Sequence, residues 1–404
     1  MTTSEPAEVK RFREYLRIKT VHPTPDYKAC AEYLTAQAKD IGLEYQVLEP
    51  VENKPFVIIK LEGSDQSLKS ILLSSHTDVV PEFWSYPPFG AERIPVENND
   101  FKIYARGSQD MKVTGSMYLE AMRRIKSSKK KLLRNVYAVF GPDEEIGGAE
   151  GVGSLIKTQE FLDLNAGFDF DEDIPNQDDQ GRFIYAERTL SQVKFTANGN
   201  TGHGSQFIES TAIEKLLPVI TEMMKFREQQ KIAHNKIPDN ERFIRSGEIT
   251  SINLTQLSGG KQANVVPATF SAIFDIRVTP LVDLDEFRAW LFEIGKINDV
   301  EVELLNPEEG RTITPIDRNN TLINSFLDGM EELGYKQTPM ICPGGTDARH
   351  IRKKGIPAFG FNPMRNHPMI AHSHNEYVLE SEFLRGITVY ESLVSRVANT
   401  ETDL

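Results

Sequence analysis

The apolar residues in the first 170 positions follow two alternating patterns. Apolar positions recur at helical spacing over residues 5–18, 27–42 and 113–126. Between these stretches lie apolar runs without alternation, namely FVIIKLEG, ILLSSHTDVV, NVYAVFGPDEE and AGFDFDED. Strands that alternate with helices predict a parallel α/β sheet. Because the runs are apolar at successive positions, we expect these strands to be covered on both faces.

The pattern changes at about Glu187. RTLSQVKFTANGN and FSAIFDIRVTP have the texture of half-exposed strands, and residues 213–229 between them have helical spacing. We interpret this segment as an inserted α+β domain of roughly 120 residues, a size that can hold its own core. After about Asn306 a βα pattern resumes. The expected organisation is a first catalytic part at 1–187, an inserted domain at 188–306 and a second catalytic part at 307–404.

Composition excludes several classes of function. The chain has 404 residues and a formal net charge of −13, which argues against binding nucleic acid or an anionic membrane surface. It contains no apolar run near the roughly 20 residues of a membrane span, and its N-terminus has no apolar core of a signal peptide. Two cysteines exclude a disulfide framework. We therefore expect a cytoplasmic protein.

Polar side chains follow several of the predicted strands. These clusters are His76 with Asp78, Asp110, Glu144 with Glu145, Asp171 with Glu172, and AHSHNE at 371–376. In open α/β sheets, sites form in the crevice beyond the carboxyl ends of the strands. Imidazoles and carboxylates brought together there are a suitable ligand set for a pair of zinc ions.

Each cluster also has an ordinary structural interpretation. His76 and Asp78 share one face of an extended strand and are compatible with a local hydrogen-bonded pair. Adjacent glutamates are typical of a solvated turn, and Asp110 suits the first turn of a helix because of the helix dipole. Only the ordered combination, with each cluster placed after a strand, favours a metal site.

Eight motifs together resemble the M20 family of di-zinc aminohydrolases, over about Glu8 to Val394. They are HTDVVP, YARGSQDMK, FGPDEEIGG, DFDED, TGHGS, NVVPA, PGGTDARHI and AHSHNEYV. The resemblance implies a zinc-peptidase-like catalytic domain with a mostly parallel central sheet, interrupted by a ferredoxin-like domain that serves as lid and dimerisation surface. It implies zinc-dependent hydrolysis of N-acyl-L-amino acids, small-molecule substrates, by a homodimer that pairs through the lid.

The resemblance also implies a role for each matching residue. Two zinc ions per subunit would be held, one by His76 and Glu172 and the other by Glu145 and His372, with Asp110 bridging both. His374 is a weaker alternative to His372. Asp78 would accept the second ring N–H of His76 and so orient that ring. The peptide bond after Asp110 would be cis.

The same comparison assigns the reaction. Glu144 would be the general base that takes a proton as a zinc-bridging hydroxide attacks the amide. His203 would stabilise the oxyanion from the partner subunit, accompanied by Asn264. Arg349 and Arg277 would anchor the substrate carboxylate. Without the resemblance, His203 reads as a polar loop residue and Arg277 as a salt-bridged strand residue.

Two other functions are weighed against this one. A cytosolic dipeptidase or carboxypeptidase of the same family would use the same zinc residues on a different substrate. A non-catalytic dimeric scaffold would be expected to lack the base or a ligand, whereas Glu144 and every expected ligand are present.

Overall fold

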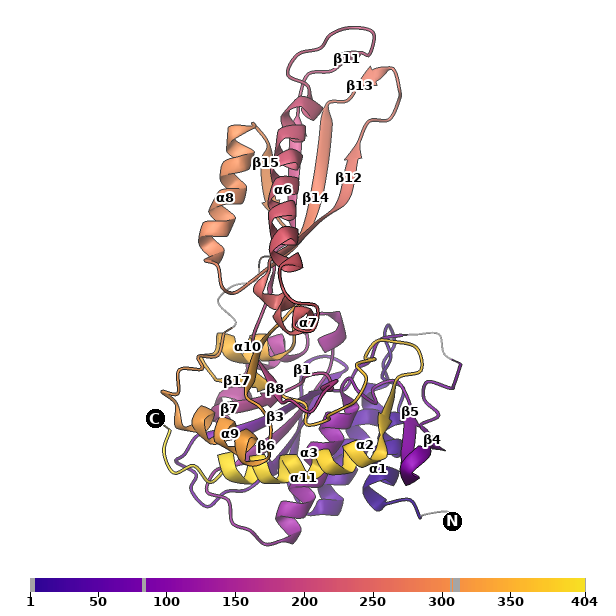
Figure 1. The fold of residues 1–404 in the computed structure, drawn as a ribbon, viewed down its shortest axis with the longest axis vertical. Helices are drawn as coiled ribbons and strands as arrows, with labels where there is room; N and C mark the ends of the chain where they lie inside the picture. Colours follow the sequence, from indigo (N-terminus) through magenta and orange to yellow (C-terminus); the bar gives the residue numbers. More distant parts are fainter. Residues whose placement is uncertain (1–3, 82–84, 306, 308–312, 404) are drawn as a thin grey trace. The chain divides into compact units, whose positions relative to one another are not determined.

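The structure is a computed structural model that describes residues 4–81, 85–305, 307 and 313–403. The chain forms two compact units, each with more contacts within itself than to the other (Figure 1). The first unit contains residues 1–185, 314–339 and 346–404, and the second contains 186–313 and 340–345. The second unit thus begins two residues before the boundary expected from the sequence. The other expected boundary, after Asn306, falls at a residue outside those described.

The first unit has a large mixed sheet. Its strands follow the order β1-β2-β6-β3-β7-β17-β8-β16. The central pairs β6/β3, β3/β7 and β7/β17 are parallel, whereas β1/β2, β2/β6 and β17/β8 are antiparallel. The bounds of these strands are β1 Glu44–Val51, β2 Lys54–Leu61, β3 Ser70–His76, β6 Val136–Gly141, β7 Ala166–Asp171, β8 Arg182–Glu187, β16 Thr338–Cys342 and β17 Ala358–Gly360.

Helices cover both faces of this sheet. A small three-stranded sheet, β4 Glu92–Pro95, β5 Phe101–Tyr104 and β18 Tyr377–Leu379, lies apart from it. The helices are α1 Ala7–Leu16, α2 Tyr27–Ile41, α3 Lys112–Ser127, α4 Val152–Leu155, α5 Gln159–Asp163, α9 Thr321–Glu332, α10 Ala348–Lys353 and α11 Glu380–Val397, with 3₁₀ turns η1 Glu97–Asn99 and η2 Glu144–Ile146. None of the helices in the described part of the chain is both long and apolar enough to cross a membrane.

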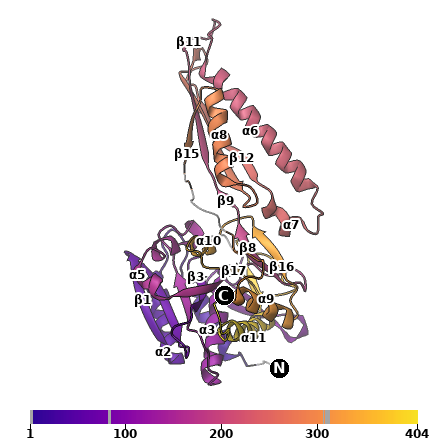
Figure 2. The same cartoon turned by 90° about the vertical axis from the view of Figure 1, so that its left-hand side faces the viewer.

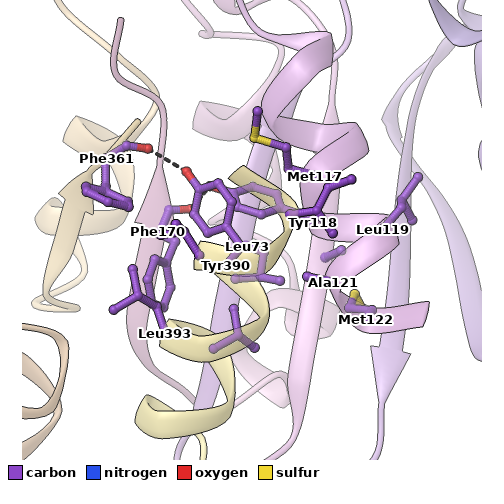
Figure 3. Close-up of a cluster of buried hydrophobic side chains, with 14 of the residues drawn as sticks. Leu73, Met117, Tyr118, Leu119, Ala121, Met122, Phe170, Phe361, Tyr390 and Leu393 are labelled. Atoms are coloured by element: carbon purple, nitrogen blue, oxygen red, sulfur yellow. Dashed lines mark hydrogen bonds between the residues drawn. The ribbon is translucent and has the colours of Figure 1, made fainter. Parts of the chain in front are cut away.

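The core of the first unit explains why the central strands lack alternation. Every residue of β3 is buried. Leu73 belongs to a cluster with α3 and α11 on one face, while Leu72 belongs to a second cluster with α4 and α10 on the other. Figure 3 shows the first cluster, where the Tyr390 hydroxyl donates to the carbonyl of Phe361 at 2.5 Å. The continuous apolar run of this strand therefore follows from its two covered faces.

The second unit has the antiparallel order β12-β14-β10-β15, with helices after β10 and β14. This is the ferredoxin-like arrangement of strands, and Figure 2 shows α6 and α8 running along the sheet. A separate two-stranded pair joins β11 to β13. The elements are β9 Thr189–Leu190, β10 Val193–Asn198, β11 Gly202–His203, α6 Ala212–Asn235, α7 Arg242–Arg245, η3 Ser246–Glu248, β12 Ser251–Gly259, β13 Val265–Val266, β14 Thr269–Val278, α8 Leu284–Ile297 and β15 Glu301–Leu304.

Local sequence signals account for several element ends. Asp26 caps α2 by accepting from the amide of Ala29, and Gly42 ends that helix in a left-handed conformation. Thr211 and Glu214 form a capping box at the start of α6. These are the residue types that satisfy unpaired groups at helix ends.

The ends of the first unit meet where the second unit is inserted. The amide of Thr314 donates to the carbonyl of Tyr185 at 2.8 Å. These are the residues at which the first unit stops before, and resumes after, the long segment 186–313 of the second unit.

Candidate metal centre

Three neighbouring strands bring the predicted ligands to one edge of the sheet. β3 ends at His76, β7 ends one residue before Glu172, and β6 ends three residues before Glu144. Because β6, β3 and β7 are mutually parallel, their carboxyl ends lie at the same edge. Asp110 comes from the loop before α3, and His372 comes from the turn before β18.

The first ligand group contains His76, Asp110 and Glu172. The Nε2 atom of His76 lies 2.9 Å from Asp110 Oδ1 and 3.3 Å from Glu172 Oε2. Its Nδ1 lies 3.0 Å from the carbonyl oxygen of Asp78. A carbonyl can only accept, so Nδ1 carries the proton and Nε2 is the atom that can bind a metal.

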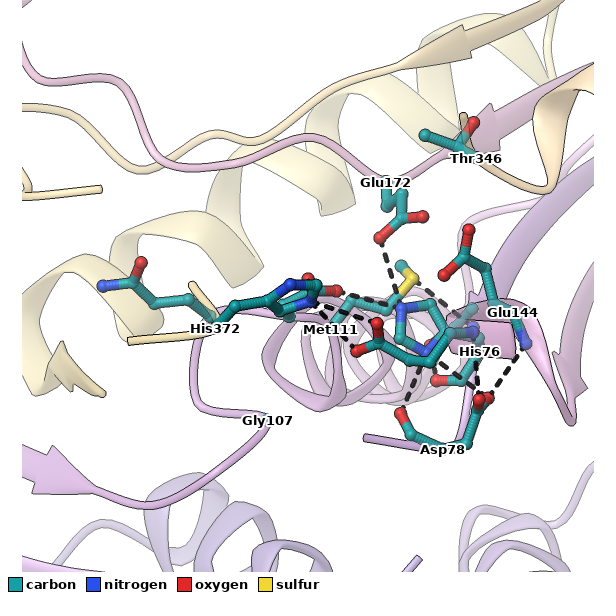
Figure 4. Close-up of polar contacts among 12 residues, drawn as sticks. His76, Asp78, Gly107, Met111, Glu144, Glu172, Thr346 and His372 are labelled. Carbon is teal, nitrogen blue, oxygen red and sulfur yellow. Dashed lines mark hydrogen bonds and ion pairs between the residues drawn. The ribbon is translucent and has the colours of Figure 1, made fainter. Parts of the chain in front are cut away.

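The second group contains Asp110, Glu145 and His372 (Figure 4). The Nε2 atom of His372 lies 3.0 Å from Asp110 Oδ2 and 3.0 Å from Glu145 Oε2. The ligand atoms of each group lie within 4.8 Å of one another. Asp110 takes part in both groups through its two oxygens, so the groups share one carboxylate. The peptide bond between Asp110 and Met111 is cis, as the family resemblance implied.

The charges of this cluster suit a divalent metal. Burial raises the pKa of Glu172 well above its usual range, and burial together with Asp110 raises the pKa of Glu145. Hydrogen bonds to Asp110 and Glu145 raise the pKa of His372 to about 10. Carboxylates crowded in this way are stabilised by a nearby positive charge. Without a metal ion, the protonated imidazole of His372 supplies that charge. The imidazole and carboxylate donors are those that zinc and similar ions bind.

Glu144 lies beside both groups. Burial raises the pKa of its carboxyl well above the usual range, and nearby Asp347, Glu145 and Asp110 add to this effect. In Figure 4 its carboxylate stands close to His76 and below Glu172. A carboxylate with a raised pKa next to a metal site is suited to take up a proton and release it again.

Asp78 holds a different set of partners from the one expected. Its nearest carboxylate oxygen is 3.6 Å from His76 Nδ1, while the Asp78 carbonyl makes the shorter contact described above. The carboxylate instead accepts the backbone N–H groups of Glu144 at 3.2 Å and Glu145 at 3.0 Å. It therefore fixes the turn that carries both glutamates, in addition to contacting the His76 ring.

His22 is the fourth partner of Asp78. Its Nε2 lies 2.9 Å from Asp78 Oδ2. The hydrogen bond to Asp78 raises the pKa of His22. Burial by itself would raise the pKa of Asp78, but the hydrogen bonds from His22 and His76 lower it. No role was predicted for His22, because it stands outside every metal motif of the sequence.

The residue before Glu144, Asp143, is also held in place by several contacts. Asp143 has a left-handed backbone, with φ 66°. The Tyr27 hydroxyl donates to Asp143 Oδ1 at 2.6 Å, and Lys54 forms an ion pair with the same carboxylate. Such strained residues are found where surrounding contacts enforce a functional turn.

Glu376 is a second residue whose role the sequence did not reveal. It is fully buried and accepts from Arg106 Nη1 at 2.6 Å and from the amides of Gln109 and Asp110 at 2.5 and 3.3 Å. Burial raises its pKa to about 7. It thereby ties the segment that carries His372 to the loop that carries Asp110. The only sequence signal was its place four residues after His372.

The remaining predicted site residues are divided between the units. Arg349 is buried in α10 of the first unit and donates to the carbonyls of Gly147 at 2.8 Å and Thr346 at 3.0 Å. The other three belong to the second unit. His203 is exposed on β11, Asn264 is exposed before β13, and Arg277 pairs with Asp275 on β14 at 3.0 Å.

The chain is similar to known proteins over almost its whole length. Residues 72–396 match the model of peptidase family M20/M25/M40. Mouse aminoacylase-1 is 41% identical over 413 aligned positions, covering 100% of this chain and 99% of the relative. Two solved structures share the fold. An M20 family metallo-carboxypeptidase of Sulfolobus solfataricus has a TM-score of 0.69 at 18% identity, with coverage of 98% of this chain and 100% of that one. A dinuclear metal binding peptidase of Bacillus subtilis has a TM-score of 0.67 at 14% identity, with coverage of 98% and 100%.

Proposed function

This chain belongs to peptidase family M20/M25/M40, and from this premise we propose that it hydrolyses N-acyl-L-amino acids to a carboxylate and a free L-amino acid. The observation that carries the proposal is the pair of ligand groups that share Asp110, with Glu144 beside them. The identity to mouse aminoacylase-1 over the whole chain supports the choice of substrate.

We propose that the two groups hold two zinc ions. His76, Asp110 and Glu172 would hold one ion, and Asp110, Glu145 and His372 the other. The ions would supply a Lewis acid that makes water nucleophilic near neutral pH and stabilises negative charge on the carbonyl oxygen.

Glu144 carries the proton in this proposal. It accepts a proton from the attacking water and delivers it to the departing amine. Asp78 holds the Glu144 and Glu145 amides, so the base and its neighbouring ligand keep a fixed separation. This rigidity supports the reaction because proton transfer needs the base within hydrogen-bonding reach.

The substrate contacts are proposals of the same kind. We assign Arg349 and Arg277 to the substrate carboxylate and His203, with Asn264, to the oxyanion. Of these, His203 and Asn264 are exposed in the second unit. Residues that contact a partner subunit would be exposed in this way when one chain is considered by itself. We propose accordingly that the second unit is a lid that also joins two copies, and that the homodimer acts in the cytoplasm.

The first test compares the wild type with Glu144→Gln on N-acetyl-L-methionine, with zinc content measured on the same samples. Glu144→Gln is expected to retain two zinc ions and to lose at least a thousandfold in kcat, because the general base is removed while the ligands remain. Glu150→Gln is the matched control, an exposed glutamate near the same turn. Equal rates in wild type and Glu144→Gln would end the proposed mechanism.

The substrate class is tested by a panel in which each N-acetyl amino acid is paired with a dipeptide of the same C-terminal residue. Higher kcat/KM on the acetylated member supports the aminoacylase assignment. Higher kcat/KM on the dipeptide indicates a peptidase, and no turnover of either by the zinc-loaded protein indicates a scaffold. Light scattering at several concentrations reports whether the protein is a dimer.

A further inference from the structure

The second unit contains a pocket of about 320 Å³. One wall is the C-terminal half of α6, and the opposite wall is the segment from Ser246 to Asn253, which includes the start of β12. Arg188, just before β9, completes the lining. All of these residues belong to one unit, so the pocket is defined without reference to the metal centre.

The side chains that line this pocket are strongly biased in charge. Arg227, Lys231 and His234 come from α6 at positions i, i+4 and i+7, which places them on one helix face. Arg188 adds a fourth basic side chain, and among the described residues no aspartate or glutamate contributes to the lining. The chain as a whole carries a net charge of −13 with histidine neutral, so two arginines, a lysine and a histidine around one pocket are a marked local reversal.

Arg188 shows the energetic consequence most clearly. Its Nε and Nη1 donate to the backbone carbonyls of Pro343 and Ile249 at 2.9 and 3.1 Å. Burial lowers the pKa of this guanidinium, and the nearby charge of Arg277 lowers it further, although Cys342 and Asp275 oppose both effects. A partly buried cation that forms no ion pair with a carboxylate is destabilising unless an anion supplies the missing charge.

Neighbouring cations in the same unit are paired with acids. Arg242 lies 2.5 Å from Asp239, Arg245 lies 2.9 Å from Glu248, and Lys225 lies 3.3 Å from Glu222. By contrast, within the described ranges no ion pair joins the four basic groups of the pocket to a carboxylate. The dipole of α6 favours basic residues in its last turn, which explains the position of His234. It does not explain Arg227, which lies two turns earlier, or Arg188, which lies outside this helix.

The walls of the pocket are tied together. The Gln230 side-chain oxygen accepts the amide of Thr250 at 3.1 Å, and Arg227 Nε donates to Asn253 Oδ1 at 3.3 Å. Both contacts bridge α6 and the start of β12. The basic groups therefore surround a space whose shape is already set in the free protein, which lowers the entropic cost of binding.

We propose that this pocket binds a small oxyanion with at least two negative charges, in the form of a phosphate group. Guanidinium and ammonium groups are the side chains that bind phosphate oxygens best. The volume lies at the lower end of the range for small-molecule sites and leaves room for a small organic group attached to the phosphate. The site goes beyond the proposed hydrolysis and uses none of its residues.

The test is calorimetric titration of the zinc-loaded full-length protein with inorganic phosphate and, separately, with glycerol 3-phosphate. Sodium chloride at matched ionic strength and sodium acetate are the reference titrations. We expect saturable binding of one phosphate per chain at this site, with glycerol 3-phosphate distinguishing an esterified from a free phosphate. Saturable binding of acetate as tight as that of phosphate would contradict a site for a multivalent anion.

Variants separate this pocket from the metal centre, which can also take up phosphate. Lys231 is exposed. Lys231→Glu is expected to weaken phosphate binding at least tenfold, whereas Lys231→Arg is expected to bind phosphate as the wild type does. Lys225→Glu, on the same helix but outside the pocket lining, is the matched control and is expected to bind as the wild type does. Equal phosphate affinity in Lys231→Glu and Lys225→Glu, with both proteins folded by circular dichroism, would overturn the proposal. Unchanged N-acetyl-L-methionine hydrolysis in the variants keeps this outcome distinct from failure of the proposed function.

Discussion

His22 is linked to the two glutamates of the candidate metal centre through one carboxylate. Asp78 is completely buried and accepts from His22 and from the backbone of Glu144 and Glu145. A buried carboxylate that loses one donor is left with an uncompensated charge, a change that costs about 1–3 kcal/mol. We therefore regard His22 as a positioning residue for the turn that carries Glu144.

Replacing His22 tests this role. His22→Phe is expected to lower kcat by about 10–100-fold, in the range seen for residues that support metal ligands, with KM near the wild-type value. His22→Gln places an amide donor near the position of the imidazole Nε2 and is expected to recover most of the loss. A purely structural role predicts instead that both variants lower thermal stability alike and leave kcat of the folded protein unchanged. Stopped assays with circular dichroism on the same samples distinguish the two.

Glu376 joins two segments that are far apart in the sequence. Glu376→Gln weakens its contact with the buried guanidinium of Arg106 and its acceptance from the Asp110 loop. We expect a zinc affinity about 10–100-fold lower and a free energy of unfolding lower by about 1–3 kcal/mol. Zinc affinity is measured by competition with a chelating dye.

The matched control for this variant is Glu380→Gln. Glu380 accepts from Arg93 at 2.5 and 2.8 Å and is likewise buried, but it does not touch the Asp110 loop. It is expected to lose stability while keeping the wild-type zinc affinity. The same zinc affinity in both variants would show that Glu376 acts on stability alone.

At the scale of elements, α3 packs on the sheet through a glycine. A Cβ atom at Gly115 would lie 2.6 Å from Ser75 Oγ and 2.9 Å from Phe140 Cε1. Helix propensity favours alanine over glycine by about 1 kcal/mol, but overpacking in a core costs typically 1–3 kcal/mol. The close approach of α3 to β3 therefore depends on the missing side chain.

We expect Gly115→Ala to lower the free energy of unfolding by about 1–2 kcal/mol, because the overpacking outweighs the gain in propensity. Ser127→Ala, at the exposed last position of α3, is the control and should change stability by less than about 0.5 kcal/mol. Urea denaturation measures both. A Gly115→Ala protein more stable than the wild type would show that the packing gives way without cost.

The elements that the sequence predicted well are those whose burial is uniform. β3, β6 and β7 are covered on both faces, so their continuous apolar runs identified them. β1 is largely exposed and was not predicted, because its polar–apolar alternation covers only Glu44–Val47, all of which are exposed. In EGVGSLIKT, where apolar positions alone suggest a longer helix, only Val152–Leu155 is helical. Gly151 and Gly153 approach the carbonyls of Pro142 and Gly148 closely there, so local packing decides the backbone.

The site residues likewise divide into those that a sequence motif marks and those that it does not. His76, Asp110, Glu145, Glu172 and His372 were proposed as ligands from motifs that follow strands, and the structure brings their side chains together. His22 and Glu376 act through other residues, and such indirect contacts leave no spacing pattern in the sequence. His203, Asn264 and Arg277 belong to the second unit, and their substrate roles stay predictions.

For the whole molecule, a partly buried histidine, His350, sets part of the acid stability. Burial and nearby Arg349 lower the pKa of His350 to about 3, whereas an unfolded histidine has a pKa of about 6.5. The unfolded chain therefore takes up a proton that the folded chain does not. The stability contributed by neutral His350 is present above pH 6.5 and is lost as the pH falls from 6.5 toward 3.

We expect the wild type to lose roughly 2 kcal/mol more than His350→Phe between pH 6.5 and pH 5, since a pKa difference of one between the folded and unfolded states corresponds to about 1.4 kcal/mol. Denaturant midpoints at the two pH values measure the difference. Lys354→Gln, which removes an exposed cation near the same helix end, should retain the wild-type dependence. Identical pH dependence in His350→Phe and the wild type would show that His350 is protonated in the folded protein.

The hydrogen bond between Thr314 and Tyr185 has a consequence for how this chain can be altered. Because these two ends of the first unit are already neighbours, the main segment of the second unit, residues 186–313, leaves and re-enters its host at nearly one point. An insertion of this kind closes no new loop within the host, whatever its own length. The part of residues 186–313 that follows β8 can therefore be exchanged for a shorter or longer module, by gene shuffling or in the laboratory, while the host sheet keeps its strand order.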